Sequence, residues 1–245
     1  MNTIYPEDRK AFASGLTYYW GSLYGSSEAL SLIEFVKTHK QVVLYIAKDI
    51  SQSSEILQAL NFYNHDLTIL SFPNWEVLAF DHFSPHPDIV SSRLKTLSQL
   101  ETLEKGIVIT SLESLTQRLC PKNYIAKYSF NIEVGSNLVI EKFTNKLLRI
   151  GYRRASSVIE QGEFNVKGAL IDIYPMGSKT PFRIDLFDNE IDSIRTFDPS
   201  TQRSIDSIEM INLLPAREFS SDEESISLFK VNYEKVFGNT DGFIY

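Results

Sequence analysis

The sequence predicts an α/β protein in which a parallel-sheet domain carries an inserted α+β domain with an antiparallel sheet. Three patterns lead to this fold class. Over the first 120 or so residues, short β-branched runs alternate with helical patterns, as in a parallel sheet covered by helices. Residues 153–214 instead show a period of two, and a helical pattern returns after Pro215. We therefore expect one domain from residues 1–121 plus 214–245 and the inserted domain from 122–213.

The first half contains three longer expected helices, one short one and three expected strands. The expected helices cover residues 27–39, 49–63 and 88–106, and the expected strands cover 41–47, 66–72 and the run that starts at 107. Asp49 or Ser51 can cap the second helix, and Gly106 is expected to close the third. The run "QVVLYIA" is typical of a buried parallel strand. A short helix should follow the last strand.

The second half predicts a helix over 141–152 and then strands that belong to an antiparallel sheet. The strand patterns are "GALIDIYP", "PFRIDLFD", "EIDSIRTFD" and "RSIDSIEMINLL". Asp188, Asn189 and Glu190 form a short polar stretch that can turn a hairpin. A last helix is expected over 220–238, with Ser221 and Glu224 at capping-box spacing and Gly238 at its end.

Composition excludes several classes of protein. The 245 residues are 43% hydrophobic and 22% charged, with a formal charge of −7, which does not suit broad binding of nucleic-acid phosphates. No run approaches the roughly 18 apolar residues of a membrane span, and the start lacks a secretion signal. Cys120 is the single cysteine, so an internal disulfide is impossible and a cytoplasmic, reducing location is expected. The chain also resembles a fragment of a longer protein.

The stretch "TYYWGSLYGSSEAL" resembles a strand, a phosphate-binding loop and a helix. A working loop follows G-x-x-x-x-G-K-[ST], in which the lysine neutralises phosphate charge and the hydroxyl binds magnesium. When the pattern starts at Gly21, Ser26 replaces the second glycine, Ser27 replaces the lysine and Glu28 replaces the hydroxyl residue. Glu28 would repel a triphosphate. We therefore expect a degenerate loop that binds no nucleotide.

Other candidates for chemistry are weak. Asp81, His82, His86 and Asp88 could be metal ligands by type, but Pro85 and Pro87 fix an extended path. A polar loop that leads into a helix capped by Asp88 is the simpler interpretation. No serine or cysteine stands in a nucleophile-elbow pattern such as G-x-S-x-G. We therefore expect no catalytic residue and no metal site.

The strand "PFRIDLFD" predicts a surface that could bind another protein. Alternation places Phe182, Ile184 and Leu186 on one face and Arg183, Asp185 and Phe187 on the other. The apolar set should pack on the core, so Phe187 should point outward beside Arg183. Arginine and aromatic residues are enriched at binding hot spots. An alternative of similar weight is that Phe187 closes the hairpin end or packs under a loop.

Three segments together resemble the N-terminal region of the bacterial transcription-repair coupling factor family, Mfd. They are "FSPHPDIVSSRLKTLSQL", residues 151–204 and "INLLPAREF". A weaker likeness links residues 162–175 to UvrB through the pattern "G-x-F-x-V-x-G-x-x-x-D-I-x-P". The resemblance extends over roughly residues 19–237. Because UvrB-like proteins keep the lysine-bearing loop, Ser27 and Glu28 fit the coupling factors better.

The resemblance implies a degenerate helicase-like domain (1A) with an inserted domain similar to UvrB domain 2. It implies docking of the repair protein UvrA through Lys167, Arg183 and Phe187, where the family usually has arginine at the first position. Lysine keeps the charge but loses the planar fork of arginine. It also implies that this surface is covered within the resting full-length protein. We expect the isolated fragment to bind UvrA without any release step.

The rest of the parent protein would supply the enzymatic activity. The resemblance implies a C-terminal motor that hydrolyses ATP with magnesium, and other domains that contact RNA polymerase and double-stranded DNA. The fragment itself is expected to be non-enzymatic, with no cofactor and no membrane contact. Two alternatives are a nucleotide-binding or DNA-remodelling domain of a UvrB-like helicase, and contact with single-stranded DNA across the first domain.

Overall fold

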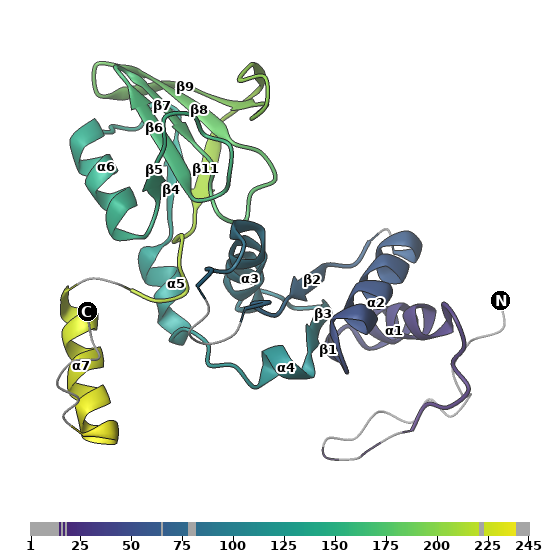
Figure 1. The fold of residues 1–245 in the computed structure, drawn as a ribbon. Helices are drawn as coiled ribbons and strands as arrows, with labels where there is room; N and C mark the ends of the chain where they lie inside the picture. Colours follow the sequence, from purple (N-terminus) through teal and green to yellow (C-terminus); the bar gives the residue numbers. More distant parts are fainter. Residues whose placement is uncertain are drawn as a thin grey trace. The chain divides into compact units, whose positions relative to one another are not determined.

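The computed structural model describes residues 15, 17, 19–64, 66–77, 82–220 and 223–238, and it confirms a mixed α/β protein with parallel and antiparallel sheets (Figure 1). The chain divides into two compact units. The first unit comprises Met1–Phe80 and Gln99–Gln117, and the second comprises Asp81–Ser98 and Arg118–Tyr245. This division differs from the expected domain ranges because residues 81–98 and 214–245 both fall in the second unit.

The first unit is built on a three-stranded parallel sheet in the order β1-β3-β2. Its strands are β1 (Val42–Ala47), β2 (Ile69–Phe72) and β3 (Gly106–Ser111). Helices α1 (Ser27–His39) and α2 (Ile50–Tyr63) pack against one face of the sheet, where Ile107 and Ile109 of β3 are fully buried (Figure 1). The short helix α4 (Leu112–Leu115) follows β3, as the sequence predicts.

Local signals explain where α1 and α2 begin and end. The Asp49 side chain caps α2 by accepting a hydrogen bond from the backbone N–H of Gln52 at 2.9 Å, which confirms Asp49 as the cap. Helix α1 ends at Lys40, which adopts a left-handed conformation with φ of 51°. Ile56 and Leu60 place one side of α2 in the apolar core of this unit.

Strand β1 differs from the buried strand that its sequence predicts. Within the described residues β1 lies at the sheet edge, and Val42, Leu44 and Ile46 are 41%, 51% and 47% exposed. Its other face contributes Val43 and Tyr45 to the core. A continuous apolar run fits both a fully covered strand and an edge strand covered on one face, so the run alone could not decide between them.

The third helix ends earlier than expected. Helix α3 (Pro87–Leu100) stops six residues before Gly106, so Gly106 does not close it and instead begins β3. Gly106 has a φ of +154°, and a Cβ there would lie 2.5 Å from the carbonyl oxygen of Thr68. Asp88 lies in the first turn of α3 because the helix begins at Pro87, so Asp88 is not the cap.

Helix α3 is held in the second unit by a buried ion pair. The Arg93 Nε donates to Glu218 Oε1 at 2.5 Å, and Arg93 Nη2 donates to Oε2 at 3.2 Å. The two side chains are 0% and 4% exposed. Each charge therefore depends on the other for compensation, since an unpaired charge in this position would be strongly unfavourable.

The second unit contains a six-stranded sheet in the order β10-β9-β8-β7-β6-β5 and a ribbon of β11 and β4. The pairings are antiparallel except for β5 with β6. The strands are β4 (Phe130–Glu133), β5 (Arg153–Arg154), β6 (Glu163–Lys167), β7 (Leu170–Ile173), β8 (Phe182–Phe187), β9 (Glu190–Phe197), β10 (Ser204–Ile208) and β11 (Met210–Leu213). Asp188, with a φ of +54°, turns the predicted hairpin between β8 and β9.

Helix α6 (Ile140–Arg149) covers one face of this sheet, which we call the inner face (Figure 1). Phe143 and Leu147 of α6 pack in the core with Ile171 and Ile184 of the sheet. The opposite face is the outer face. Helix α5 (Lys122–Tyr128), which the sequence analysis missed, adds Tyr124 and Ile125 to the same core.

The last helix, α7 (Glu223–Phe237), buries none of its residues. Gly238, with a φ of +78°, ends the helix as expected. Ser221, the predicted cap, lies outside the described residues. Across the described part of the chain, no helix is both long enough and apolar enough to cross a membrane.

Candidate functional site

The structure places Lys167, Arg183 and Phe187 on the outer face of the six-stranded sheet. Along β8, Ile184 and Leu186 are buried on the inner side, as alternation predicts. Lys167 of β6 pairs with Leu170 of β7, which in turn pairs with Asp185 of β8. The three candidate residues therefore share one face, although they occupy different parts of it.

Phe187 and Lys167 lie at the same end of the outer face, next to the β8–β9 and β6–β7 turns. Phe187 ends β8 and is 75% exposed, whereas Lys167 ends β6 and is also exposed. A hydrogen bond from the Leu186 N–H to the Ala169 carbonyl, at 3.0 Å, ties β8 to the β6–β7 turn at this end. The outward orientation of Phe187 is confirmed. Phe187 does not pack under a loop, but it does lie at the hairpin end, where it pairs with Glu190.

Arg183 is held differently. Its Nε donates to Asp172 Oδ1 at 2.7 Å and its Nη2 donates to Asp172 Oδ2 at 2.9 Å. Its Nη1 donates to the carbonyl of Gln202 at 3.0 Å, and the guanidinium carbon lies 4.9 Å from the ring centre of Phe197. The hydrogen bond to Asp172 is the main reason that the pKa of Arg183 is raised.

Arg183 therefore does not present a free guanidinium on the outer face. The Arg183 side chain is 18% exposed and the carboxylate of Asp172 is 4% exposed. Loop residues contribute to this burial, because Gln202 contacts Arg183 and also donates to the Val158 carbonyl at 3.2 Å. Alternation assigns a side chain to a face of a sheet, but it gives no information about loops that fold over that face.

A second cross-strand ion pair lies beside the first, and sequence reasoning did not find it. Arg195 of β9 stands directly opposite Arg183 and donates to Asp185 of β8. Ser193 donates to the same carboxylate at 3.3 Å. Two arginines in directly opposite positions would repel each other, so each pairs with an aspartate of a neighbouring strand. The sequence signal for these ion pairs was the spacing of two, which places Asp172 and Asp185 on the same face as the arginines.

The loop before α1 does not have the features of a phosphate loop. The described residues 19–25 form no strand, so the strand expected there is absent from them. Ser26 caps α1 without a side-chain hydrogen bond, and the Ser27 hydroxyl donates to the Tyr24 carbonyl at 2.8 Å. A Cβ at Gly21 would meet no atom within 4 Å, so this glycine is not required for close packing.

Glu28 is bonded to the sheet of its own unit. The Tyr45 hydroxyl of β1 donates to Glu28 Oε1 at 3.0 Å. Burial raises the pKa of Tyr45, and the hydrogen bond to Glu28 raises it further. The Glu28 carboxylate, which lies in the first turn of α1, thus has Tyr45 of β1 as a structural partner.

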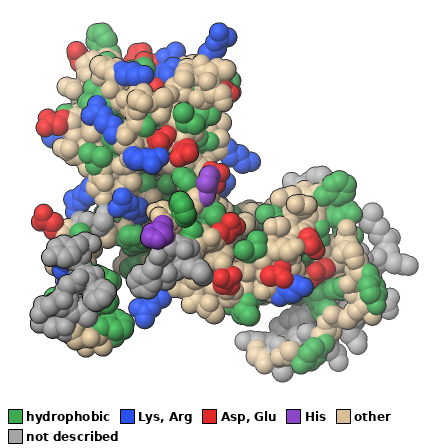
Figure 2. Space-filling view, viewed as in Figure 1, with side chains coloured by type: hydrophobic (Ala, Val, Ile, Leu, Met, Phe, Trp, Pro, Cys, Tyr) green, Lys and Arg blue, Asp and Glu red, His purple; other side chains and the backbone are tan. Residues whose placement is uncertain are grey.

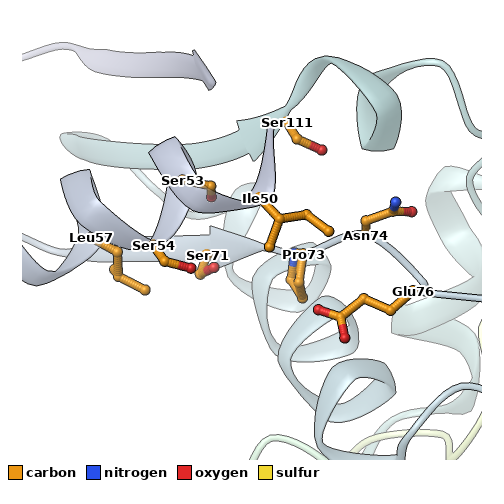
Figure 3. Close-up of a pocket in the computed structure, with 9 residues that line it drawn as sticks. All are labelled: Ile50, Ser53, Ser54, Leu57, Ser71, Pro73, Asn74, Glu76 and Ser111. Carbon is orange, nitrogen blue, oxygen red and sulfur yellow. The ribbon is translucent and has the colours of Figure 1, made fainter. Parts of the chain in front are cut away.

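The first unit also contains a small pocket near the ends of β2 and β3 and the start of α2 (Figure 3). Its volume is about 90 Å³, far below the roughly 300–1,000 Å³ of a typical small-molecule site. Serine side chains at 53, 54, 71 and 111 line it together with Asn74 and Glu76. The carboxylate of Glu76 makes this lining unfavourable for phosphate.

The histidine segment brings few ligands together. His82 and His86 are exposed, and His86 Nδ1 lies 3.4 Å from Asp88 Oδ2, while Asp81 lies outside the described residues. No group of three or more potential metal ligands occurs within the described residues. Cys120 is half-buried, and burial raises the pKa of its thiol.

The part of the second unit that contains its sheet is similar to a known protein family. Residues 130–219 match the family model of the UvrB interaction domain. The matched region runs from β4 through β11 and therefore contains Lys167, Arg183 and Phe187.

The matched region lies within a longer similarity to curated proteins. The chain is 41% identical over 218 residues to the transcription-repair-coupling factor of Haemophilus influenzae, and 38% identical over 217 residues to that of Escherichia coli. Each alignment covers 89% of this chain. The factor of Staphylococcus aureus is 32% identical over 246 residues, which is 98% of this chain. The chain spans about a fifth of the length of these relatives, from 19% to 21%.

Proposed function

We propose that this chain is a non-enzymatic module of a transcription-repair coupling factor that docks UvrA and so recruits it to RNA polymerase stalled at DNA lesions. The observation that carries the proposal is Phe187, which is 75% exposed on the outer face of a UvrB interaction domain. A benzyl group that exposed gains nothing from its own fold, whereas an interface could bury it fully.

The three candidate residues have different roles in this proposal. Phe187 supplies the apolar anchor, and the Lys167 ammonium at the same end of the sheet supplies a cation for a carboxylate of UvrA. Arg183 uses three of its five N–H donors within the fold, so it offers at most the remaining two to UvrA. Because its position is already fixed, Arg183 loses little conformational freedom on docking.

Replacement of Phe187 by alanine tests the proposal. We expect Phe187→Ala to weaken the complex with purified UvrA by about 2 kcal/mol, roughly thirtyfold in the dissociation constant, because a hot-spot side chain is lost. Biolayer interferometry with immobilised UvrA gives the measurement. Lys167→Ala should have a smaller effect in the same direction.

Phe62 of α2 provides a matched control, because it is 74% exposed and lies in the first unit. Phe62→Ala should leave UvrA affinity unchanged. Both variants should unfold at the denaturant concentration of the original chain, since neither ring is buried. Undiminished UvrA binding by Phe187→Ala would rule out this docking surface.

We also propose that the loop at Gly21, Ser26, Ser27 and Glu28 binds no nucleotide. The hydrogen bond between Tyr45 and Glu28 supports this, because a triphosphate there would meet a carboxylate and no lysine of the loop. Isothermal titration of the chain with ATP and magnesium should show no saturable heat. Clear saturation would favour the alternative, a nucleotide-binding domain of a UvrB-like helicase.

The remaining activities of such a factor would belong to other parts of the parent protein. ATP hydrolysis with magnesium, translocation on double-stranded DNA and contact with RNA polymerase are assigned to those parts under this proposal. A cytoplasmic location follows from the same assignment, since transcription and repair share that compartment in bacteria.

A further inference from the structure

Helix α6 carries a stripe of cations on the side that faces away from the core. Lys142, Lys146 and Arg149 are all exposed and occupy positions i, i+4 and i+7, which fall on one side of a helix. Arg154 of β5 is exposed as well. We call these four residues the α6 basic surface. Figure 2 shows Lys and Arg side chains over the part of the molecule that α6 forms in Figure 1.

These cations lack carboxylate partners. Within the described residues, Lys142, Arg149 and Arg154 make no ion pair. The Lys146 ammonium lies over the Phe130 ring, 3.2 Å from its centre. Arg153 offers a contrast, because it pairs with Glu160 at 3.3 Å and with Glu163 at 2.8 Å. The positive charge of the α6 basic surface is therefore not neutralised by carboxylates among the described residues, and it is available to another molecule.

The stability of α6 does not explain this arrangement. Like charges at positions i and i+4 of a helix, as at Lys142 and Lys146, repel each other and destabilise the helix. Lys146 and Arg149 lie in the last turn, where they are favourable to the helix dipole, but Lys142 lies near the start, where a cation is unfavourable. Glu141 is the acidic residue of the helix and falls outside the stripe.

The α6 basic surface lies on the inner side of the sheet, away from the candidate UvrA surface. Arg154 pairs in register with Phe164, whose ring is in the inner core, whereas Arg153 pairs with Glu163. Side chains of directly paired residues share a face. Arg154 is thus on the same side as α6, and Lys167, Arg183 and Phe187 are on the other side.

We propose that the α6 basic surface contacts the phosphate backbone of double-stranded DNA without reading its sequence. At 1.5 Å per residue, the three helical cations span about 10 Å along the axis. Successive phosphates of one strand of B-form DNA advance about 3.4 Å along the axis while turning around it, so the long lysine and arginine side chains of a stripe this long can reach about three of them. Lysine and arginine contacts to phosphate fix position but carry no base information. The proposal does not depend on UvrA docking.

The charge of the whole chain limits the strength of this contact. A formal charge of −7 means that the chain as a whole repels DNA, so attraction must come from a local surface such as the α6 basic surface. We expect a weak complex whose logarithmic affinity falls with the logarithm of salt concentration at a slope of about −3, as three phosphate contacts imply. A binding mode spread over the chain would not depend on these particular residues.

The test is fluorescence anisotropy of a labelled duplex of mixed sequence, titrated with the full chain over a series of KCl concentrations. The variant Lys142→Glu/Lys146→Glu/Arg149→Glu should bind roughly tenfold or more weakly and lose most of the salt dependence. The variant Lys142→Glu/Arg149→Glu leaves the contact of Lys146 with Phe130 intact. It should show a similar loss while keeping the unfolding midpoint of the original chain.

The control Lys179→Glu/Lys230→Glu/Lys235→Glu changes the total charge equally at exposed positions outside α6. It should bind the duplex as the original chain does. Equal loss in the control, unchanged binding by the α6 variants, or no salt-dependent binding by the original chain would each overturn the proposal. Preference for the single strand, or for poly-glutamate over the duplex, would overturn it in favour of a different partner.

Discussion

Arg183 and Phe187 lie four residues apart on β8, and the structure gives them different surroundings. Phe187 is 75% exposed, whereas the guanidinium of Arg183 is bonded to Asp172 and to the Gln202 carbonyl. The period of two was enough to assign both to the outer face. It could not reveal the partners of Arg183, because Gln202 belongs to a loop whose path depends on tertiary structure.

Arg183→Ala should destabilise the second unit. It would leave the carboxylate of Asp172, which is 4% exposed, without its main partner. We expect the free energy of unfolding to fall by about 2–4 kcal/mol. This is slightly less than for a fully buried pair, because Arg183 keeps some solvent contact. Urea unfolding followed by circular dichroism measures the loss. The alternation that places Arg183 on the face away from the core gives no sign of this loss.

The double variant Asp172→Ala/Arg183→Ala separates the ion pair from other effects. It should be more stable than the sum of the single losses predicts, because no charge is left buried alone. Additive losses would mean that the pair contributes no coupling. For UvrA binding, this coupling makes Phe187→Ala the cleaner variant, since Arg183→Ala changes the fold and the surface together.

At the level of elements, the sequence predicted the described helices α1, α2 and α6 and the strands β7, β8 and β9 closely. Each of them has a strong period or a clear cap, such as Asp49 before α2. The sequence failed where tertiary context decides. Helix α5 is too short for a periodic signal, and β1 is an edge strand despite its continuous apolar run.

Gly106 shows how a correct signal can be assigned to the wrong element. A glycine after an amphipathic run commonly ends a helix, yet here α3 ends at Leu100 and Gly106 starts β3. The reason for glycine is the Thr68 carbonyl, which a Cβ would approach to 2.5 Å. That carbonyl also accepts the Ile107 N–H at 2.9 Å, so it cannot move without weakening the sheet.

We therefore expect Gly106→Ala to destabilise the first unit by about 3 kcal/mol or more, because it combines backbone strain with a clash against the backbone. The control is Gly135→Ala, where φ is +79° and a Cβ would meet no atom within 4 Å. This control should cost only about 1–2 kcal/mol, the penalty of the left-handed conformation. Urea unfolding of both variants gives the comparison, and equal losses would contradict the role of Thr68.

At the level of the whole molecule, the two units have separate apolar cores. Ile107 and Ile109 belong to the core of the first unit, while Phe164 and Ile184 belong to that of the second. The change from helical to period-two patterning near Cys120 lies close to the observed division at Gln117 and Arg118. The assignment of α3 to the second unit was not visible in the sequence, because the Arg93 and Glu218 pair joins residues 125 positions apart.

Under the two proposals made above, the placement of α6 on one side of the six-stranded sheet has a consequence for regulation. A cover that shields Phe187 and Lys167 in a resting protein would lie over the outer face and leave Lys142 and Arg149 accessible. A cover that prevents UvrA from reaching the outer face would therefore still allow DNA to contact the α6 basic surface. The unit could stay anchored to DNA while its recruiting face is closed, so that opening it would release UvrA-binding capacity already located at the nucleic acid.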